Sequence, residues 1–208
     1  MPSTRFPVSI LQKGVKVTDE PPRGLKANLM KTYMGMEHKH FENIKQKKPE
    51  WKKLVFGLAF FHALILERRK YGALGWNIPY QFSQMDMAIS LAQIKIFLES
   101  YDEIPFKALT YMIAECNYGG RVTDPMDRRL INVVLNNFFT DDILENDYKF
   151  SESGVYFAPP EGNLESYKEY IRSLPGYDPP EVFGLHENAN ITSGINDTNE
   201  LLDSILAL

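Results

Sequence analysis

A chain of 208 residues is long enough for one domain with an appendage and for a substantial hydrophobic core. Its 44% hydrophobic and 24% charged residues are typical of a globular protein and exclude the disordered and fibrous classes. The net charge of −4 argues against nucleic-acid recognition, which needs a basic surface, so we expect no nucleic-acid partner.

The cysteine content and the apolar runs indicate the compartment. Cys116 is the single cysteine, so no internal disulfide can form, and no signal peptide opens the chain. The longest apolar run, Leu54 to Leu66, contains Gly57 and His62 and is shorter than the roughly 20 residues of a membrane span. The sequence therefore predicts a cytoplasmic chain with no membrane segment, in which this run is a buried helix.

The first elements are a short extended segment and two helices. Alternating apolar residues from Arg5 to Val17 predict extended backbone, and a helix is expected from Gly24. Pro49 then stands where a first helical position should be, and the helix after it is apolar nearly all round. This helix should be central, and Gly72 should end it.

The middle of the chain predicts a loop followed by further helices. Glycine and proline mark residues 75–80 as a loop, and Ser83 with Asp86 resembles a capping box that opens a helix to about Tyr101. Its inward face should comprise Met85, Ala88, Ile89, Ala92 and Ile96. A shorter helix follows over 105–116, and Asp124 caps another, whose inward residues should be Met126, Leu130, Val133 and Val134. Four antiparallel helices of this kind form a bundle, so the fold class is mainly α.

The last third of the chain is richer in tyrosine and proline. It predicts one helix near 163–173 and a final helix from about Asp197. The apolar stripe of that final helix comprises Leu201, Leu202, Ile205 and Leu208. Because leucines are costly to leave in water, we expect this stripe to dock on the bundle or to self-associate.

The ionisable residues offer no complete catalytic or metal site. Nucleotide hydrolysis needs a glycine-rich loop that ends in Gly-Lys-Ser/Thr, and the sequence has none. His38 and His40 would point to different faces of a helix, and His186 has no ligand partner at suitable spacing. His62, on an apolar helix, is expected to be a hydrogen-bonded core histidine. We therefore predict no catalytic residue, no cofactor and no metal in this chain.

The remaining nucleophile and acids have structural explanations. Cys116 has neither a histidine nor an orienting group beside it, and is expected to be a buried structural thiol. Asp141, Asp142 and Glu145 are expected to be solvated acids near a helix start rather than a catalytic pair.

The most informative stretch is Glu115 to Asp124. Two adjacent glycines, Gly119 and Gly120, allow positive φ in an interhelical turn, where Arg121 should be exposed. The whole string, however, closely resembles a signature of dynein heavy chains of the axonemal type. The resemblance extends to Phe6–Gln12, Glu20–Leu29, Phe60–Ala63, Leu74–Tyr80 and His186–Thr192, and so brings Pro22, Gly24 and Trp76 into the signature. Lys13, Ala73 and Met126 replace residues usual in the family, which bears on local packing and not on membership.

The resemblance implies a place in the dynein motor. Residues 1–22 would end the large subdomain of the sixth AAA+ module, 23–145 would form its helical lid, and 146–208 would lead toward the C-terminal domain. It implies a mechanical, non-hydrolysing lid, with ATP and magnesium bound by other modules. The implied partners are neighbouring AAA+ modules and the C-terminal domain and, through the parent motor, microtubules and dynein intermediate and light chains. The implied location is the axoneme of a cilium or flagellum.

Two other functions stay open at this point. The chain could keep a nucleotide-responsive site through Arg23, Lys26 or Arg121, or it could be a free-standing adaptor domain. An adaptor would need a complete N-terminal boundary, and the segment from Phe6 to Val17 does not resemble one.

Overall fold

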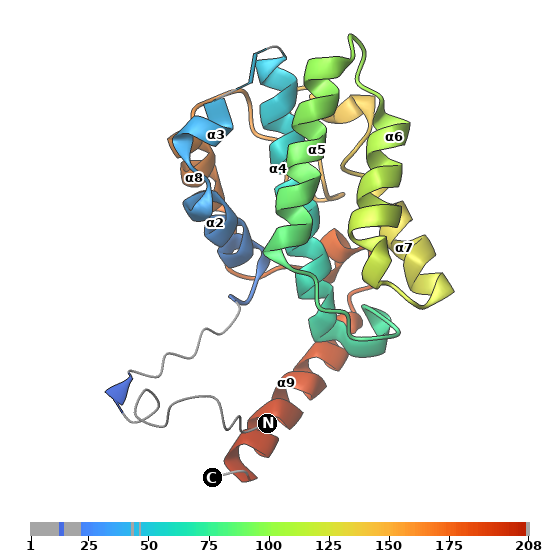
Figure 1. Cartoon of the computed structure of the whole chain (residues 1–208). Helices are drawn as coiled ribbons and strands as arrows, with labels where there is room; N and C mark the ends of the chain where they lie inside the picture. The colour runs from blue at the N-terminus through green and yellow to red at the C-terminus, as the bar shows by residue number, and fades with distance from the viewer. Residues whose placement is uncertain (1–12, 15–21, 43, 46, 207–208) are drawn as a thin grey trace.

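The computed structural model describes residues 13–14, 22–42, 44–45 and 47–206. These residues form a helical bundle and include no strand, which confirms the mainly α fold (Figure 1). Its α-helices are α2 (Leu25–Gly35), α3 (His38–Glu42), α4 (Lys48–Glu67), α5 (Gln84–Ser100), α6 (Phe106–Tyr111), α7 (Pro125–Asn136), α8 (Leu164–Ser173) and α9 (Ala189–Leu206). Shorter helical turns are η1 (Arg68–Leu74), η2 (Met112–Asn117), η3 (Gly119–Arg121), η4 (Asp141–Leu144) and η5 (Pro180–Phe183). The expected extended segment over 5–17 lies outside the described residues except for residues 13 and 14.

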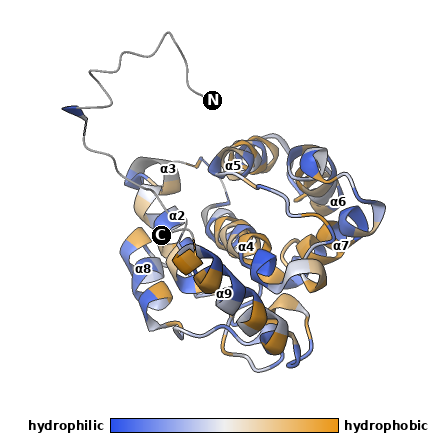
Figure 2. Ribbon diagram, turned by 90° about the horizontal axis from the view of Figure 1, so that it is seen from below, coloured by the Kyte–Doolittle hydropathy of each residue, from blue (hydrophilic) through white to orange (hydrophobic). Residues whose placement is uncertain are grey.

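Helix α4 is the centre of the bundle, as its sequence predicts. Leu54, Val55 and Phe60 on three sides of it are each at most 1% exposed. Helices α2, α5 and α7 pack on α4, while α8 packs on α2 and α6 packs on α7 (Figure 1). The view from below shows α4 surrounded by the other helices (Figure 2). In the described part of the chain, none of the helices has the length and hydrophobicity needed to cross a membrane.

Helix α5 has the predicted bounds but buries a different face. Its inward residues are Asp86, Met87, Ser90, Ile94 and Leu98. The residues predicted to face inward are exposed, namely Met85, Ala88, Ile89, Ala92 and Ile96. The prediction is wrong because α5 is apolar on both sides, so apolar periodicity does not choose between them. Hydrogen bonds of the inward polar residues decide the orientation.

The inward face of α7 is also only partly as predicted. Val134 is buried and Leu130 is half-buried, but Met126 and Val133 are 68% and 55% exposed. Asp127 is buried in their place, because its carboxylate accepts hydrogen bonds from backbone amides of the loop at residues 75–80. A polar side chain thus sets the rotation of this helix as well.

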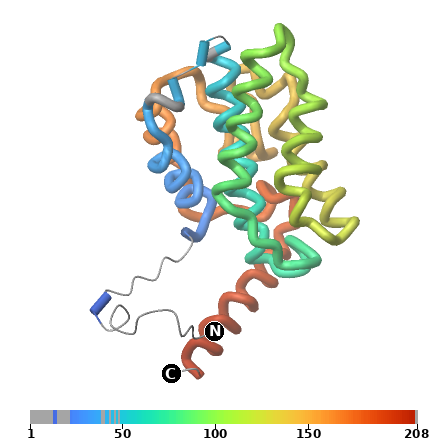
Figure 3. Tube along the Cα trace, in the orientation of Figure 1, coloured from blue at the N-terminus to red at the C-terminus, as the bar shows by residue number. Residues whose placement is uncertain are grey.

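Two buried lysines on α4 donate hydrogen bonds to the irregular segment between α7 and α8. Figure 3 shows this segment running from one side of the bundle to the other. Lys53 donates through Nζ to the carbonyls of Leu144 and Glu145, and to Oδ1 of Asn146 at 3.1 Å. Lys52 donates to the carbonyl of Gly162 at 2.9 Å. Such charged hydrogen bonds satisfy carbonyl groups that the irregular backbone leaves without helical partners.

Helix α9 begins at Ala189, well before the predicted start at Asp197. Its first half is anchored on η1, where Nδ2 of Asn196 donates to the carbonyl of Lys70 at 3.0 Å. Its second half projects from the end of the bundle (Figure 1), and the stripe residues Leu201, Leu202 and Ile205 are between 52% and 61% exposed. The expected docking of these three residues on the bundle is therefore wrong. The fourth stripe residue, Leu208, lies outside the described residues.

Candidate functional site at the signature end

The signature residues lie at one end of the bundle, hereafter the signature end, where α2, α5 and α7 begin (Figure 1). Asp86, in the first turn of α5, contacts both the residue that caps this helix and the turn that contains the double glycine. Its carboxylate accepts from the backbone N of Ser83 at 2.8 Å, which completes the predicted capping box. It also accepts two hydrogen bonds from Arg121, from Nε at 3.0 Å and from Nη2 at 3.1 Å. Arg121 is thus paired, and its bidentate contact fixes the turn after η2 onto the start of α5.

The environment of Asp86 favours its ionised form. Burial by itself would raise the pKa of this carboxyl, since only 8% of its side chain is exposed. The hydrogen bonds from Arg121 and Ser83 outweigh burial and lower the pKa below its ordinary value. The pair is therefore held as a carboxylate and a guanidinium.

A second junction connects the loop at residues 75–80 to the start of α7. Asp124 caps α7 as predicted, accepting from the backbone N of Met126 and Asp127 at 2.8 and 3.0 Å. It also accepts from Nδ2 of Asn77 at 3.2 Å. Trp76 is 4% exposed and anchors the loop by donating from Nε1 to the carbonyl of Ile65 on α4 at 3.1 Å.

The two glycines of the signature have different surroundings, and neither has positive φ. That expectation is wrong because both residues lie in the 3-10 helix η3. A Cβ on Gly119 would lie 2.2 Å from the carbonyl oxygen of Ala114, whereas a Cβ on Gly120 would have no neighbour within 4 Å. Close backbone approach at Gly119, rather than an unusual dihedral angle, requires a residue without a side chain.

Pro22 and Gly24 form a third junction at the N-terminus of α2. Gly24 has φ of +94°, and the next amide, that of Leu25, donates to Oδ2 of Asp178 at 2.8 Å. The carbonyl of Pro22 accepts from Nδ2 of Asn28 at 2.9 Å. A residue 153 positions away in the sequence therefore caps this helix.

A second buried hydrogen bond to the central helix comes from the residue before the double glycine. Nδ1 of His62 on α4 lies 3.0 Å from the hydroxyl of Tyr118, next to the double glycine. Burial lowers the pKa of His62 to about 4, so the ring is neutral near pH 7. The prediction of a hydrogen-bonded core histidine is confirmed.

The basic residues considered for nucleotide binding all contact protein acceptors. Nη2 of Arg23 contacts Oε2 of Glu200 at 3.1 Å, and Nζ of Lys26 donates to the carbonyl of Leu174 at 2.9 Å. These partners differ from that of Arg121, so the three cations do not converge on one point. Among the described residues, no group of three metal-ligating side chains is found.

Cys116 is exposed, so its predicted burial is wrong. It lies in the π-helical turn η2, whose inward residues are its neighbours Ile113 and Ala114. The acids Asp141, Asp142 and Glu145 are exposed, as predicted.

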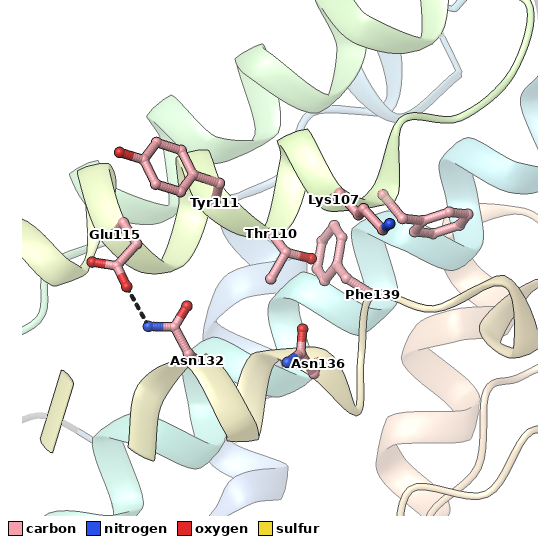
Figure 4. Close-up of a pocket in the computed structure, with 8 residues that line it drawn as sticks. Lys107, Thr110, Tyr111, Glu115, Asn132, Asn136 and Phe139 are labelled. Atoms are coloured by element: carbon pink, nitrogen blue, oxygen red, sulfur yellow. Dashed lines mark hydrogen bonds between the residues drawn. The ribbon is translucent and has the colours of Figure 1, made fainter. Parts of the chain in front are cut away.

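The surface of the described chain has hollows on two sides of the bundle, among others. One, of about 310 Å³, lies between α6 and α7 and is lined by polar residues such as Lys107, Thr110 and Asn136 (Figure 4). On its wall, Nδ2 of Asn132 donates to Oε1 of Glu115 at 2.6 Å. The other, of about 1170 Å³, lies between α9, η1 and the start of α2. Both are open and of mixed polarity, and the larger one is lined by side chains of both charges, among them Arg69, Lys70 and Asp203.

Sequence comparisons identify the domain. A family model described as the dynein heavy chain AAA lid domain matches residues 51–189. Dynein axonemal heavy chain 12 from Homo sapiens is 51% identical over 209 residues, which cover 99% of this chain and 7% of that protein. Dynein axonemal heavy chain 3 from Mus musculus is 52% identical over 99% of this chain and 5% of its own length. Dynein axonemal heavy chain 1 from Homo sapiens is 50% identical over 100% of this chain and 5% of its own length. The chain thus spans only a small part of these relatives. It belongs to the dynein heavy chain family and contains the AAA lid domain of that family.

Proposed function

We propose that this lid is a mechanical part of an axonemal dynein motor ring and does not itself hydrolyse ATP. The observation that carries the proposal is the bidentate Arg121–Asp86 pair, which joins the turn after η2 to the start of α5 at 3.0 and 3.1 Å. Together with the Asn77–Asp124 contact, it connects the loop at residues 75–80 and the starts of α5 and α7 at the signature end. A connected unit of rigid helices can pass a displacement from one side of the domain to the other.

In this proposal the lid belongs to the sixth AAA+ module of its heavy chain. It packs on neighbouring modules and on the C-terminal domain and transmits rearrangements that ATP binding drives elsewhere in the ring. Microtubules and the intermediate and light chains are partners of the whole motor, and the location is the axoneme. The three relatives reported above are axonemal heavy chains, which supports the axonemal assignment.

Calorimetry with magnesium ATP tests the non-hydrolysing part of the proposal. The 208-residue chain should give no binding heat, because isolated basic residues hold phosphate weakly without convergent backbone amides. Arg121→Ala serves as the matched variant. Submillimolar binding by the wild-type chain that disappears in Arg121→Ala would replace the mechanical role with a nucleotide-responsive one.

A further inference from the structure

Helix α5 carries an apolar face that no described residue covers. This α5 outer face consists of Met85, Ala88, Ile89, Ala92 and Ile96. Met85, Ile89 and Ile96 are 65%, 44% and 59% exposed, while the opposite side of α5 packs on α4. A helix in a globular domain normally has one apolar stripe, which faces the core, so a second apolar stripe on the opposite side of α5 calls for a second covering element. The α5 outer face therefore lacks a partner among the residues that the structure describes.

The geometry of the α5 outer face fits one helix. Residues 85, 89, 92 and 96 follow one another at steps of four, three and four, the spacing of a helix–helix seam. The small residues Ala88 and Ala92 lie between the larger Met85 and Ile96, and they allow the backbone of a partner to approach closely. None of these five residues is charged, and the exposed Glu99 follows Ile96 at the C-terminal end of the same side, so the partner should be apolar along residues 85–96.

The size of the α5 outer face argues for a partner in the same polypeptide. Its five side chains offer on the order of 400 Å² of contact, below the roughly 800 Å² per partner of a standard interface between separate proteins. A second copy would therefore bind weakly. A segment of the same chain loses less freedom on docking, because its local concentration is already high. The relatives supply such segments, since the matched part is only 5–7% of their length.

We propose that the α5 outer face is the docking site for an uncharged apolar helix from another module of the same heavy chain. This inference rests on the proposed function, because it assumes that the lid sits within a motor ring. It assigns the contact to one helix and to Met85, Ile89 and Ile96 in particular.

Hydroxyl-radical footprinting of Met85 tests this proposal in two proteins, the 208-residue chain and the heavy chain that contains it. Met85 should be oxidised at least about fivefold more slowly in the heavy chain, because the partner helix excludes water from it. Ile89→Glu should remove that protection. Leu202→Glu is the matched control, since it places the same charge at an exposed apolar position on α9, and it should retain the protection. In the 208-residue chain, Ile89→Glu should leave the melting temperature within about 2 °C of wild type, because the residue is exposed.

Three results would overturn the proposal. Equal oxidation of Met85 in both proteins would show that nothing covers the α5 outer face. Protection in the 208-residue chain that disappears on dilution would identify a second copy as the occupant. Protection that survives Ile89→Glu would place the contact elsewhere. Binding of ATP in the calorimetry described above would refute the proposed function without changing the footprint, so the two failures are distinguishable.

Discussion

Gly119 and Gly120 are adjacent in the sequence but should respond differently to the same substitution. Gly119→Ala forces a methyl group against the carbonyl of Ala114, which would be only 2.2 Å away, and should lower the free energy of unfolding by about 1–3 kcal/mol. Gly120→Ala meets no neighbour within 4 Å and has no positive φ to lose, so it should change stability by less than about 1 kcal/mol. Urea titration of both variants measures the difference. Equal losses would mean that the two glycines share one role.

Arg121 should contribute to stability although half of its side chain is exposed. Arg121→Ala leaves the buried carboxylate of Asp86 without its bidentate partner and should cost about 1–2 kcal/mol, after allowance for solvent screening. Because the folded-state pKa of Asp86 lies below its ordinary value, this contribution is present above the unfolded pKa and is lost as pH falls through the folded one. Chemical denaturation at neutral and acidic pH checks both effects. A variant as stable as wild type at pH 7 would contradict the role given to this pair.

His62 should make the lid sensitive to mild acid. Its folded-state pKa of about 4 lies below the ordinary value, so between pH 6.5 and 4 the unfolded chain binds the proton more readily. The contribution of neutral His62 to the free energy of unfolding is fully present above pH 6.5. It decreases by up to about 3 kcal/mol as the pH falls through this range. His62→Gln should flatten that part of the stability curve, measured by urea titration from pH 7 to 4. Parallel curves for the two proteins would rule out His62 as the source.

At the level of elements, the helices themselves could be predicted more reliably than their rotation. Pro49 and the apolar run after it predicted α4, and Asp124 with Pro125 predicted the start of α7. The buried faces of α5 and α7 could not be read from apolar spacing, because Asp86 and Asp127 turn inward to reach partners on other segments. Such partners lie far away in the sequence, and periodicity contains no information about them.

Helix α9 should behave as two halves. Ala189 and Asn196 anchor its first half, whereas Leu201, Leu202 and Ile205 extend beyond the bundle. Truncation after Glu200 should therefore shift the melting temperature by less than about 2 °C, because the described side chains that it removes bury little surface. Truncation before Ala189 is the matched comparison and should lower it more. A large loss from the shorter truncation would show that the projecting half is docked in solution.

For the whole molecule, the family could be inferred from the signature string, but the contacts that the signature residues make with one another and with distant segments could not. The exposure of Arg121 was predicted correctly, but its pairing with Asp86 was not, and the expected glycines of positive φ and buried Cys116 are wrong. The structure shows close packing at Gly119, a bidentate ion pair between the exposed Arg121 and Asp86, and an exposed thiol at Cys116. Asp178, which caps α2 from 153 residues away, has no local sequence signal at all. Contacts of this kind depend on tertiary packing, which brings distant segments together after the local elements are fixed. The boundaries at residues 22/23 and 145/146 stay predictions.

In the proposed function, the signature end transmits motion and takes no part in ATP hydrolysis. The most direct test of this function is the ratio of microtubule gliding velocity to ATPase rate for a heavy chain that contains this lid, with Arg121→Ala compared with Gly120→Ala. Breaking the Arg121–Asp86 pair should lower that ratio about threefold or more while the ATPase rate stays within about twofold of wild type, and Gly120→Ala should leave both unchanged. If velocity and ATPase rate instead fall together in Arg121→Ala, the residue acts on ATP hydrolysis and the mechanical account is wrong.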